Sequence, residues 1–152
     1  MAREPDEQQS AAIARLRDAF KVGKSALTPD FFIKAASDLD TALFDGQIKD
    51  RVTISWSDMH FFKTLALRGT CPTSLSSKKI HIRLNKVYFI LDSKETLWGT
   101  LIHEMLHAYL LLATRQERQI GTDAHDEGFL MTVERIVARL DFKGLKVKDV
   151  ME

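Results

Sequence analysis

The spacing of apolar residues predicts two helices in the first third of the chain. Apolar positions recur every three to four residues over residues 6–22 and again from Thr28 to Gly46. The Thr28 hydroxyl group can cap the second helix, and Pro29 suits its first position. A solvated, frayed leader is the alternative for residues 6–22. The expected apolar stripes contain Ile13, Leu16 and Phe20, then Phe32, Ala35, Leu39 and Leu43.

A period of two then predicts a small sheet. Residues 51–56 and 79–84 alternate between apolar and polar side chains, and residues 61–68 give a weaker signal for a strand between them. Because the connections are short enough for hairpins, we expect three antiparallel strands. Residues 69–77 predict a turn region, whereas residues 87–91 are apolar and undecided between strand and helix.

The most apolar segment predicts a buried helix. Asp92 or Ser93 can cap a helix that continues through residues 101–113, LIHEMLHAYLLLA, where almost every face is apolar. A polar loop is expected at residues 114–124, followed by a final amphipathic helix at residues 127–140. The stripe of this last helix contains Phe129, Val133, Ile136 and Leu140. The predicted fold class is therefore α+β, with helices packed on a small three-stranded antiparallel sheet.

Composition and charge limit the classes of protein. A chain of 152 residues is long enough to bury a core as one domain, and its only cysteine, Cys71, excludes an internal disulfide. The N-terminal sequence lacks the features of a secretory signal, and the apolar run is interrupted by His103, Glu104 and His107, which argues against a membrane span. A net charge of +1 predicts no strong global attraction to nucleic acid or membranes. We expect an intracellular monomer.

Three residues of the buried helix have the spacing of a zinc hydrolase. His103 and His107 are four positions apart, so one helix face presents both imidazole groups to an ion. Glu104 lies beside this site, where a carboxylate can take a proton from metal-bound water. The alternative is two core histidines hydrogen-bonded to the backbone, with Glu104 paired to a cation. Because buried polar groups need partners, the full motif favours a single Zn²⁺ ion per chain, with Glu104 as the general base.

A catalytic zinc ion usually has three protein ligands and an open position for water. The metzincin pattern is excluded, because Leu110 and Ala113 stand where that class has glycine and histidine. His125, at the start of the final helix, is the leading candidate for the third ligand, but chemistry alone also allows a carboxylate. The carboxylate candidates are Glu127, Glu134, Asp123 and Asp126.

Several motifs occur in a specific order around H-E-x-x-H. The segment HEMLHAYLLLAT precedes a polar loop and AHDEGF, and LFDGQI, the Trp56-Ser57 pair, the Cys71 region and IRL at residues 82–84 lie upstream. In this combination, residues 28–140 resemble the SprT-like metalloprotease domain, the catalytic domain of the Spartan proteases that degrade proteins crosslinked to DNA. The chain departs from the family pattern at Asp126, where the family has a glycine.

The resemblance implies both a fold and an activity. It implies a zincin-like domain with the motif on a buried helix, in which His103, His107 and His125 bind zinc and Glu104 is catalytic. The implied function is a zinc-dependent endopeptidase that acts on DNA-associated or DNA-crosslinked proteins in DNA repair, with a nuclear location. We divide the chain into an N-terminal helix or leader (1–27), a SprT-like metalloprotease domain (28–142) and a basic C-terminal tail (143–152).

Two other groups of residues are candidates for substrate and DNA contacts. A protein substrate could add as a strand beside Ile80, His81, Ile82 and Arg83, unless this strand is interior and has no free edge. Because the net charge of the protein is so small, DNA binding would require a local basic cluster. The alternative is that these residues are ordinary solvated charges on the surface. The basic candidates are Arg68, Lys78, Lys79, Arg83 and the tail lysines.

Other polar residues near the motif have simpler interpretations. Tyr109 falls on the far side of the helix from the two histidines, which predicts a core position. His60 and His81 would approach the cleft only if their strands line it, and otherwise they belong to the surface or the edge of the core.

Two other functions compete with a DNA-directed protease. One is a general intracellular metallopeptidase that needs no nucleic acid. The other is a catalytically silent, zinc-stabilised binding module, although a purely structural zinc site has no use for a base such as Glu104.

Overall fold

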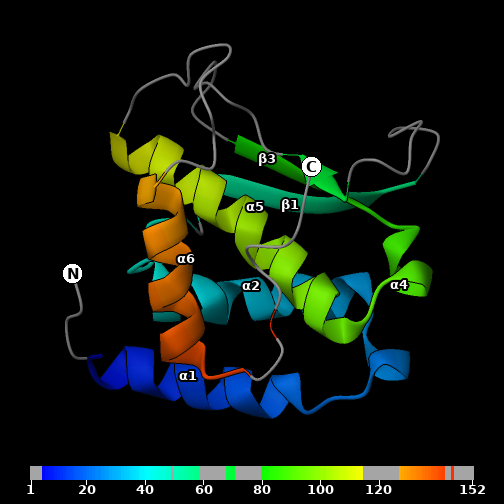
Figure 1. Ribbon diagram of the computed structural model, residues 1–152, viewed down its shortest axis with the longest axis horizontal. Helices are drawn as coiled ribbons and strands as arrows, with labels where there is room; N and C mark the ends of the chain where they lie inside the picture. Colours follow the sequence, from blue (N-terminus) through cyan, green and yellow to red (C-terminus); the bar gives the residue numbers. More distant parts are fainter. Residues whose placement is uncertain are drawn as a thin grey trace.

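Helices surround a small sheet in the computed structural model of the chain, which describes residues 5–48, 50–58, 68–70, 80–114, 127–142 and 145 (Figure 1). The sheet lies along one side of the layer formed by α2 and α5, and α1 lies on the other side (Figure 1). The predicted α+β class is confirmed. The elements are α1 (Glu7–Phe20), the 3-10 helix η1 (Lys24–Ala26), α2 (Pro29–Leu43), β1 (Val52–Ser57), β2 (Gly69–Thr70), β3 (Ile80–Asn85), α4 (Tyr88–Leu91), α5 (Lys94–Thr114) and α6 (Glu127–Leu140).

Capping side chains define the starts of α1 and α2. The Thr28 hydroxyl oxygen accepts a hydrogen bond from the Phe31 amide at 3.1 Å, and Pro29 is the first helical residue, as predicted. At α1, Asp6 and Gln9 each accept a hydrogen bond from the other's backbone amide and form a capping box. The predicted stripe of α1 is buried and α1 packs against α2, so this segment is an integral helix and not a frayed leader.

The sheet is mixed, so the prediction of three antiparallel strands is wrong. Strand β1 runs parallel to β3, with Val52 opposite Ile80, whereas β2 runs antiparallel to β3 through Gly69 and Thr70. The strand order is therefore β1-β3-β2. Alternating apolar residues indicate which face of a strand is buried, but they carry no information on the direction of its neighbour. The segment between β1 and β3 is long enough for the crossover that a parallel pair requires.

Strand β2 also differs in position from the prediction. It occupies Gly69–Thr70, at the start of the segment for which a turn is predicted. The weaker strand prediction at residues 61–68 falls outside the described residues except for Arg68. A two-residue strand is too short to produce a period of two, so the sequence pattern could not reveal it.

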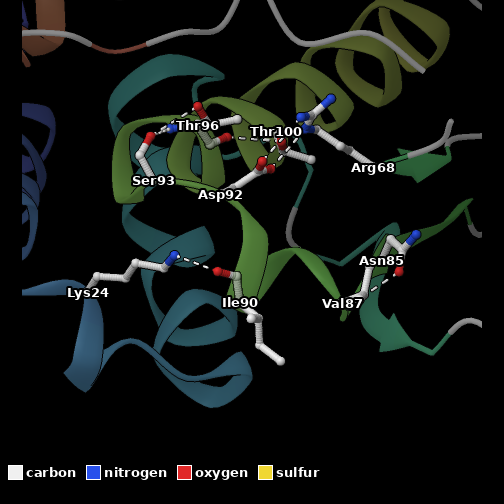
Figure 2. Close-up of polar contacts among 9 residues, drawn as sticks. All are labelled: Lys24, Arg68, Asn85, Val87, Ile90, Asp92, Ser93, Thr96 and Thr100. Atoms are coloured by element: carbon white, nitrogen blue, oxygen red, sulfur yellow. Dashed lines mark hydrogen bonds and ion pairs between the residues drawn. The ribbon is translucent and has the colours of Figure 1, made fainter. Parts of the chain in front are cut away.

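A polar junction connects β2 to the start of α5. The Arg68 guanidinium group donates to both carboxylate oxygens of Asp92, at 2.8 and 3.1 Å (Figure 2). Residues 87–91, for which the sequence pattern is undecided between strand and helix, include the short helix α4, which leads into Asp92. Ser93 then begins α5, because its hydroxyl oxygen accepts a hydrogen bond from the Thr96 amide at 3.2 Å. This junction fixes the start of α5 relative to the sheet.

Helix α5 is buried on most of its faces, as its composition predicts. Trp98 is fully buried, and its ring lies edge-on to Phe20 of α1 and Phe32 of α2, with ring centroids 4.8 Å apart in both pairs. The other buried apolar residues of α5 are Leu97, Leu101, Ile102, Met105, Leu106, Ala108, Leu111 and Leu112. In α6, the predicted residues Val133, Ile136 and Leu140 are buried. Among the helices of the described residues, none is long and apolar enough to cross a membrane.

Candidate metal centre

Helix α5 places the three motif residues beneath the sheet. His103 and Glu104 are buried, with relative exposures of 1% and 0%, whereas His107 is half-buried. Since α5 packs against β2 and β3, these strands cover the buried part of the motif. The partial exposure of His107 indicates the side from which solvent reaches the pair.

The two histidine side chains have a separation that suits one metal ion. Their Nε2 atoms are 3.2 Å apart, and the rings are inclined at 76°. Two nitrogen atoms bound to one tetrahedral zinc ion at its usual bond length would be roughly 3.3–3.4 Å apart. The same separation also suits a hydrogen bond between a protonated and an unprotonated ring nitrogen. The described geometry therefore fits zinc without a rearrangement of α5.

Glu104 is held against β2 by a close approach at Gly69. A Cβ atom added to Gly69 would lie 3.1 Å from Cγ of Glu104, 2.9 Å from Cδ2 of Leu84 and 3.3 Å from the Arg83 carbonyl oxygen. Glycine at this position therefore lets the β2 backbone lie directly beside the Glu104 side chain. Sequence reasoning does not identify this role, because Gly69 begins a small-residue segment that predicts a turn equally well.

The expected third ligand, His125, falls outside the described residues. The same is true of Asp123 and Asp126 and of the Glu127 side chain. Within the part of the chain that the structure describes, no group of three histidine, cysteine, aspartate or glutamate side chains is positioned to hold a metal ion. Glu134 is described and exposed on α6, so it does not join the histidine pair. The structure brings two predicted ligands together and argues against Glu134 as the third.

The strand considered for substrate addition, β3, is the middle strand of the sheet. It pairs with β1 along its length, and β2 lies on its other side, opposite Arg83 and Leu84. Ile80 and Ile82 are buried in the core, whereas His81 is exposed on the opposite face of β3. In the described sheet β3 therefore lies between two strands, although β2 pairs with it only opposite Arg83 and Leu84.

His81 forms a local contact away from the metal centre. Its Nε2 atom lies 2.7 Å from the Ser55 hydroxyl oxygen, on the face of β3 opposite Leu84, which packs towards Glu104. Partial burial, and then the positive charge of Arg83, lower the pKa of His81 below its ordinary value of 6.5. This geometry places His81 outside the catalytic machinery.

The lowered pKa of His81 gives a test by pH titration. Because the folded state disfavours the charged imidazole, this contribution to stability is fully present above pH 6.5 and is lost as the pH falls through the lower folded pKa. We expect the His81 ring resonances in NMR spectra to titrate below pH 6.5, and Arg83→Gln to move the midpoint upward. A midpoint at or above 6.5 in the folded protein would contradict the lowered pKa of His81.

Of the basic residues considered for DNA binding, the structure describes Arg68 and Arg83. Arg68 pairs with Asp92, and its guanidinium carbon lies 4.6 Å from the centre of the Tyr88 ring. Arg83 is half-buried on β3, and Lys78 and Lys79 fall outside the described residues. Arg68 thus has a structural role in the junction between β2 and α5.

The remaining candidates near the motif are not at the histidine pair. Tyr109 is half-buried and packs against Phe44, with ring centroids 5.1 Å apart, on the far side of α5 from the histidines. His60 falls outside the described residues.

Comparison with known protein families gives a match over most of the chain. The model of the SprT-like family matches residues 33–149, which include the sheet, α5 and α6. The match also includes all three residues of the H-E-x-x-H motif and His125. No curated protein matches the chain.

Proposed function

Because the chain belongs to the SprT-like family, we propose that it is a zinc-dependent endopeptidase that acts on DNA-associated or DNA-crosslinked proteins. Family membership supports a metallopeptidase-like domain. The observation that carries the proposal is the 3.2 Å separation of the His103 and His107 Nε2 atoms beside the buried Glu104. The DNA-related part of the proposal derives from the resemblance of the motifs to those of the Spartan proteases.

Each motif residue has a separate role in the proposed reaction. His103, His107 and His125 would hold a zinc ion, which supplies a water molecule of lowered pKa and polarises the scissile carbonyl group. Glu104 accepts a proton from the attacking water and delivers it to the leaving amine nitrogen. Since β2 and β3 cover Glu104, the carboxylate has a fixed position and little contact with bulk water.

Strand β2 is better placed than β3 to align a peptide substrate. It is the outermost strand on its side of the described sheet, and Gly69 brings its backbone against Glu104. A substrate that adds beside β2 would form main-chain hydrogen bonds with little dependence on its sequence. This mode of binding suits a protease for varied crosslinked proteins.

Enlarging Gly69 is expected to displace Glu104. In Gly69→Ala, the new Cβ atom would meet Glu104 and Leu84 at the distances given above, so we expect cleavage to fall by roughly 3- to 10-fold because of misplacement of the base. Overpacking should also lower the free energy of unfolding by about 1–3 kcal/mol. Steady-state cleavage and thermal unfolding measure the two effects.

Gly23→Ala provides the matched control. Nothing lies within 4 Å of its added Cβ atom, and its φ of −68° suits alanine. Its activity and stability should stay close to those of the wild type, within about 0.5–1 kcal/mol. Equal cleavage by the Gly69→Ala and Gly23→Ala variants would contradict the role given to Gly69.

Dependence on DNA tests the proposed substrate class. Cleavage of a DNA-crosslinked protein should exceed cleavage of the same protein without DNA, and the difference should fall steeply as salt is raised from about 50 to 200 mM, because phosphate contacts release counterions. Equal, salt-insensitive cleavage of both substrates would support the general metallopeptidase instead.

A further inference from the structure

A cavity lies behind the site helix α5, away from the histidine pair. Its volume is about 730 Å³, and residues of α1, α2, α5 and α6 line it. Tyr109 contributes from α5, on the face turned roughly 160° from His107. A cavity of this size is within the range that binds small organic ligands.

The charge of the cavity wall is strongly positive for a nearly neutral protein. Among the lining residues that the structure describes, Arg17, Arg135 and Arg139 stand against one carboxylate, that of Asp45. These arginines come from α1 and α6, so the fold gathers them from distant parts of the sequence. The described lining side chains therefore carry a net charge of about +2 at neutral pH.

Hydrogen bonds to backbone carbonyl groups position two of these arginines. Nη1 of Arg139 donates to the Ala42 carbonyl oxygen at 3.1 Å, and Nε of Arg17 lies 3.5 Å from the Leu140 carbonyl oxygen. A carbonyl oxygen carries no net charge, so these two contacts orient the guanidinium groups without neutralising them. The guanidinium group of Arg17 has five N–H donors in a rigid plane, and the bond to the Leu140 carbonyl oxygen uses one of them.

The rest of the wall offers apolar contact. Ile13, Leu43 and Ile136 line the cavity together with the Tyr109 ring. An inorganic anion would use the arginines and leave this surface without contact. An organic group attached to the anion would bury this apolar surface, and the binding free energy would become more favourable by about 25 cal/mol per Å² of apolar area buried.

We propose that this cavity binds a phosphomonoester that carries an apolar or aromatic group. A phosphomonoester has a charge of about −1.5 to −2 at neutral pH and three acceptor oxygens, which match the charge and the donors of the arginines. The ligand is either a free phosphorylated molecule of nucleotide size or a phosphorylated side chain of a partner protein. The proposal is independent of the peptidase function, because none of the described lining residues belongs to the metal centre.

Calorimetric titration of the full chain tests the proposal with three probes: inorganic phosphate, adenosine monophosphate and a short phosphotyrosine peptide. We expect saturable binding of at least one organic phosphate, at least about 10-fold tighter than inorganic phosphate, because only the organic ligands bury the apolar wall. Tighter binding of the nucleotide would indicate a free molecule, and tighter binding of the peptide would indicate a partner protein.

Arginine variants locate the binding. Arg135→Gln and Arg17→Gln should each weaken binding by about 5-fold or more. Arg15→Gln makes the same charge change on α1, but Arg15 pairs with Asp38 and does not line the cavity, so this control should change binding less than about 2-fold. Phosphate bound at a metal ion would not respond to these arginines. Absence of saturable binding, equal affinity for all three probes, or unchanged affinity in the Arg135 and Arg17 variants would overturn the proposal.

Discussion

The Glu104→Gln variant is expected to keep its zinc and to lose cleavage by roughly 10²- to 10⁴-fold. Glutamine has nearly the size of glutamate, so the packing of this fully buried side chain against Gly69 is preserved. Its carboxamide group cannot accept the proton that the proposed reaction transfers. The values of kcat/KM on a DNA-crosslinked protein, together with metal analysis of the same samples, measure both parts of this prediction.

Glu95→Gln is the control for this substitution. Glu95 lies in the first turn of the same helix, so its replacement removes one negative charge from α5 without touching the metal centre. Cleavage should be unchanged, and the loss of a favourable charge near a helix N-terminus costs about 0.3–1 kcal/mol of stability. If Glu104→Gln cleaved as fast as Glu95→Gln, Glu104 would have no role as a base. A wild-type protein that held zinc without any cleavage would support the silent binding module.

Replacement of a histidine ligand is expected to remove both metal and activity. His103→Ala removes the imidazole group that supplies one of two nitrogen atoms 3.2 Å apart. Mutation of a residue that only hydrogen-bonds a metal ligand lowers metal affinity by up to about 100-fold, so loss of the ligand itself should lower zinc affinity by more than that. Cleavage should fall in proportion to the zinc content. Equilibrium dialysis against zinc, followed by activity measurements, tests this result.

His81→Ala is the control, because it removes a histidine that lies away from the metal centre. His81 contacts Ser55 on the outer face of β3, so zinc content and cleavage should both stay at wild-type levels. Retention of full zinc affinity in His103→Ala would mean that His103 is a core histidine hydrogen-bonded to His107, which is the alternative to a metal ligand.

The helices were predictable from sequence because their signals are local. Thr28 and Pro29 mark the start of α2, and the apolar stripe of residues 127–140 corresponds to the observed α6. Strand direction is a property of two strands brought together in space, so no periodicity within residues 51–56 could reveal that β1 runs parallel to β3. The Arg68 and Asp92 ion pair likewise joins residues that have no common sequence pattern.

In the candidate site, too, local contacts could be predicted from the sequence and contacts between separate elements could not. His103 and His107 meet because a helix brings residues four apart together, which the sequence specifies directly. The contact between Gly69 and Glu104 depends on how the sheet lies on α5, which no local motif encodes. His125 is in a separate segment from α5, so its role comes from the family resemblance and not from helix geometry.

Restoration of activity by zinc tests the central claim most directly. The wild-type protein is depleted of metal with a chelator, and cleavage is followed while zinc is returned in steps. The metal-free protein should be inactive, and cleavage should rise until it levels off at about one zinc ion per chain. Full cleavage by the metal-free protein, or no recovery of activity once zinc has bound, would contradict a zinc peptidase centred on His103, Glu104 and His107.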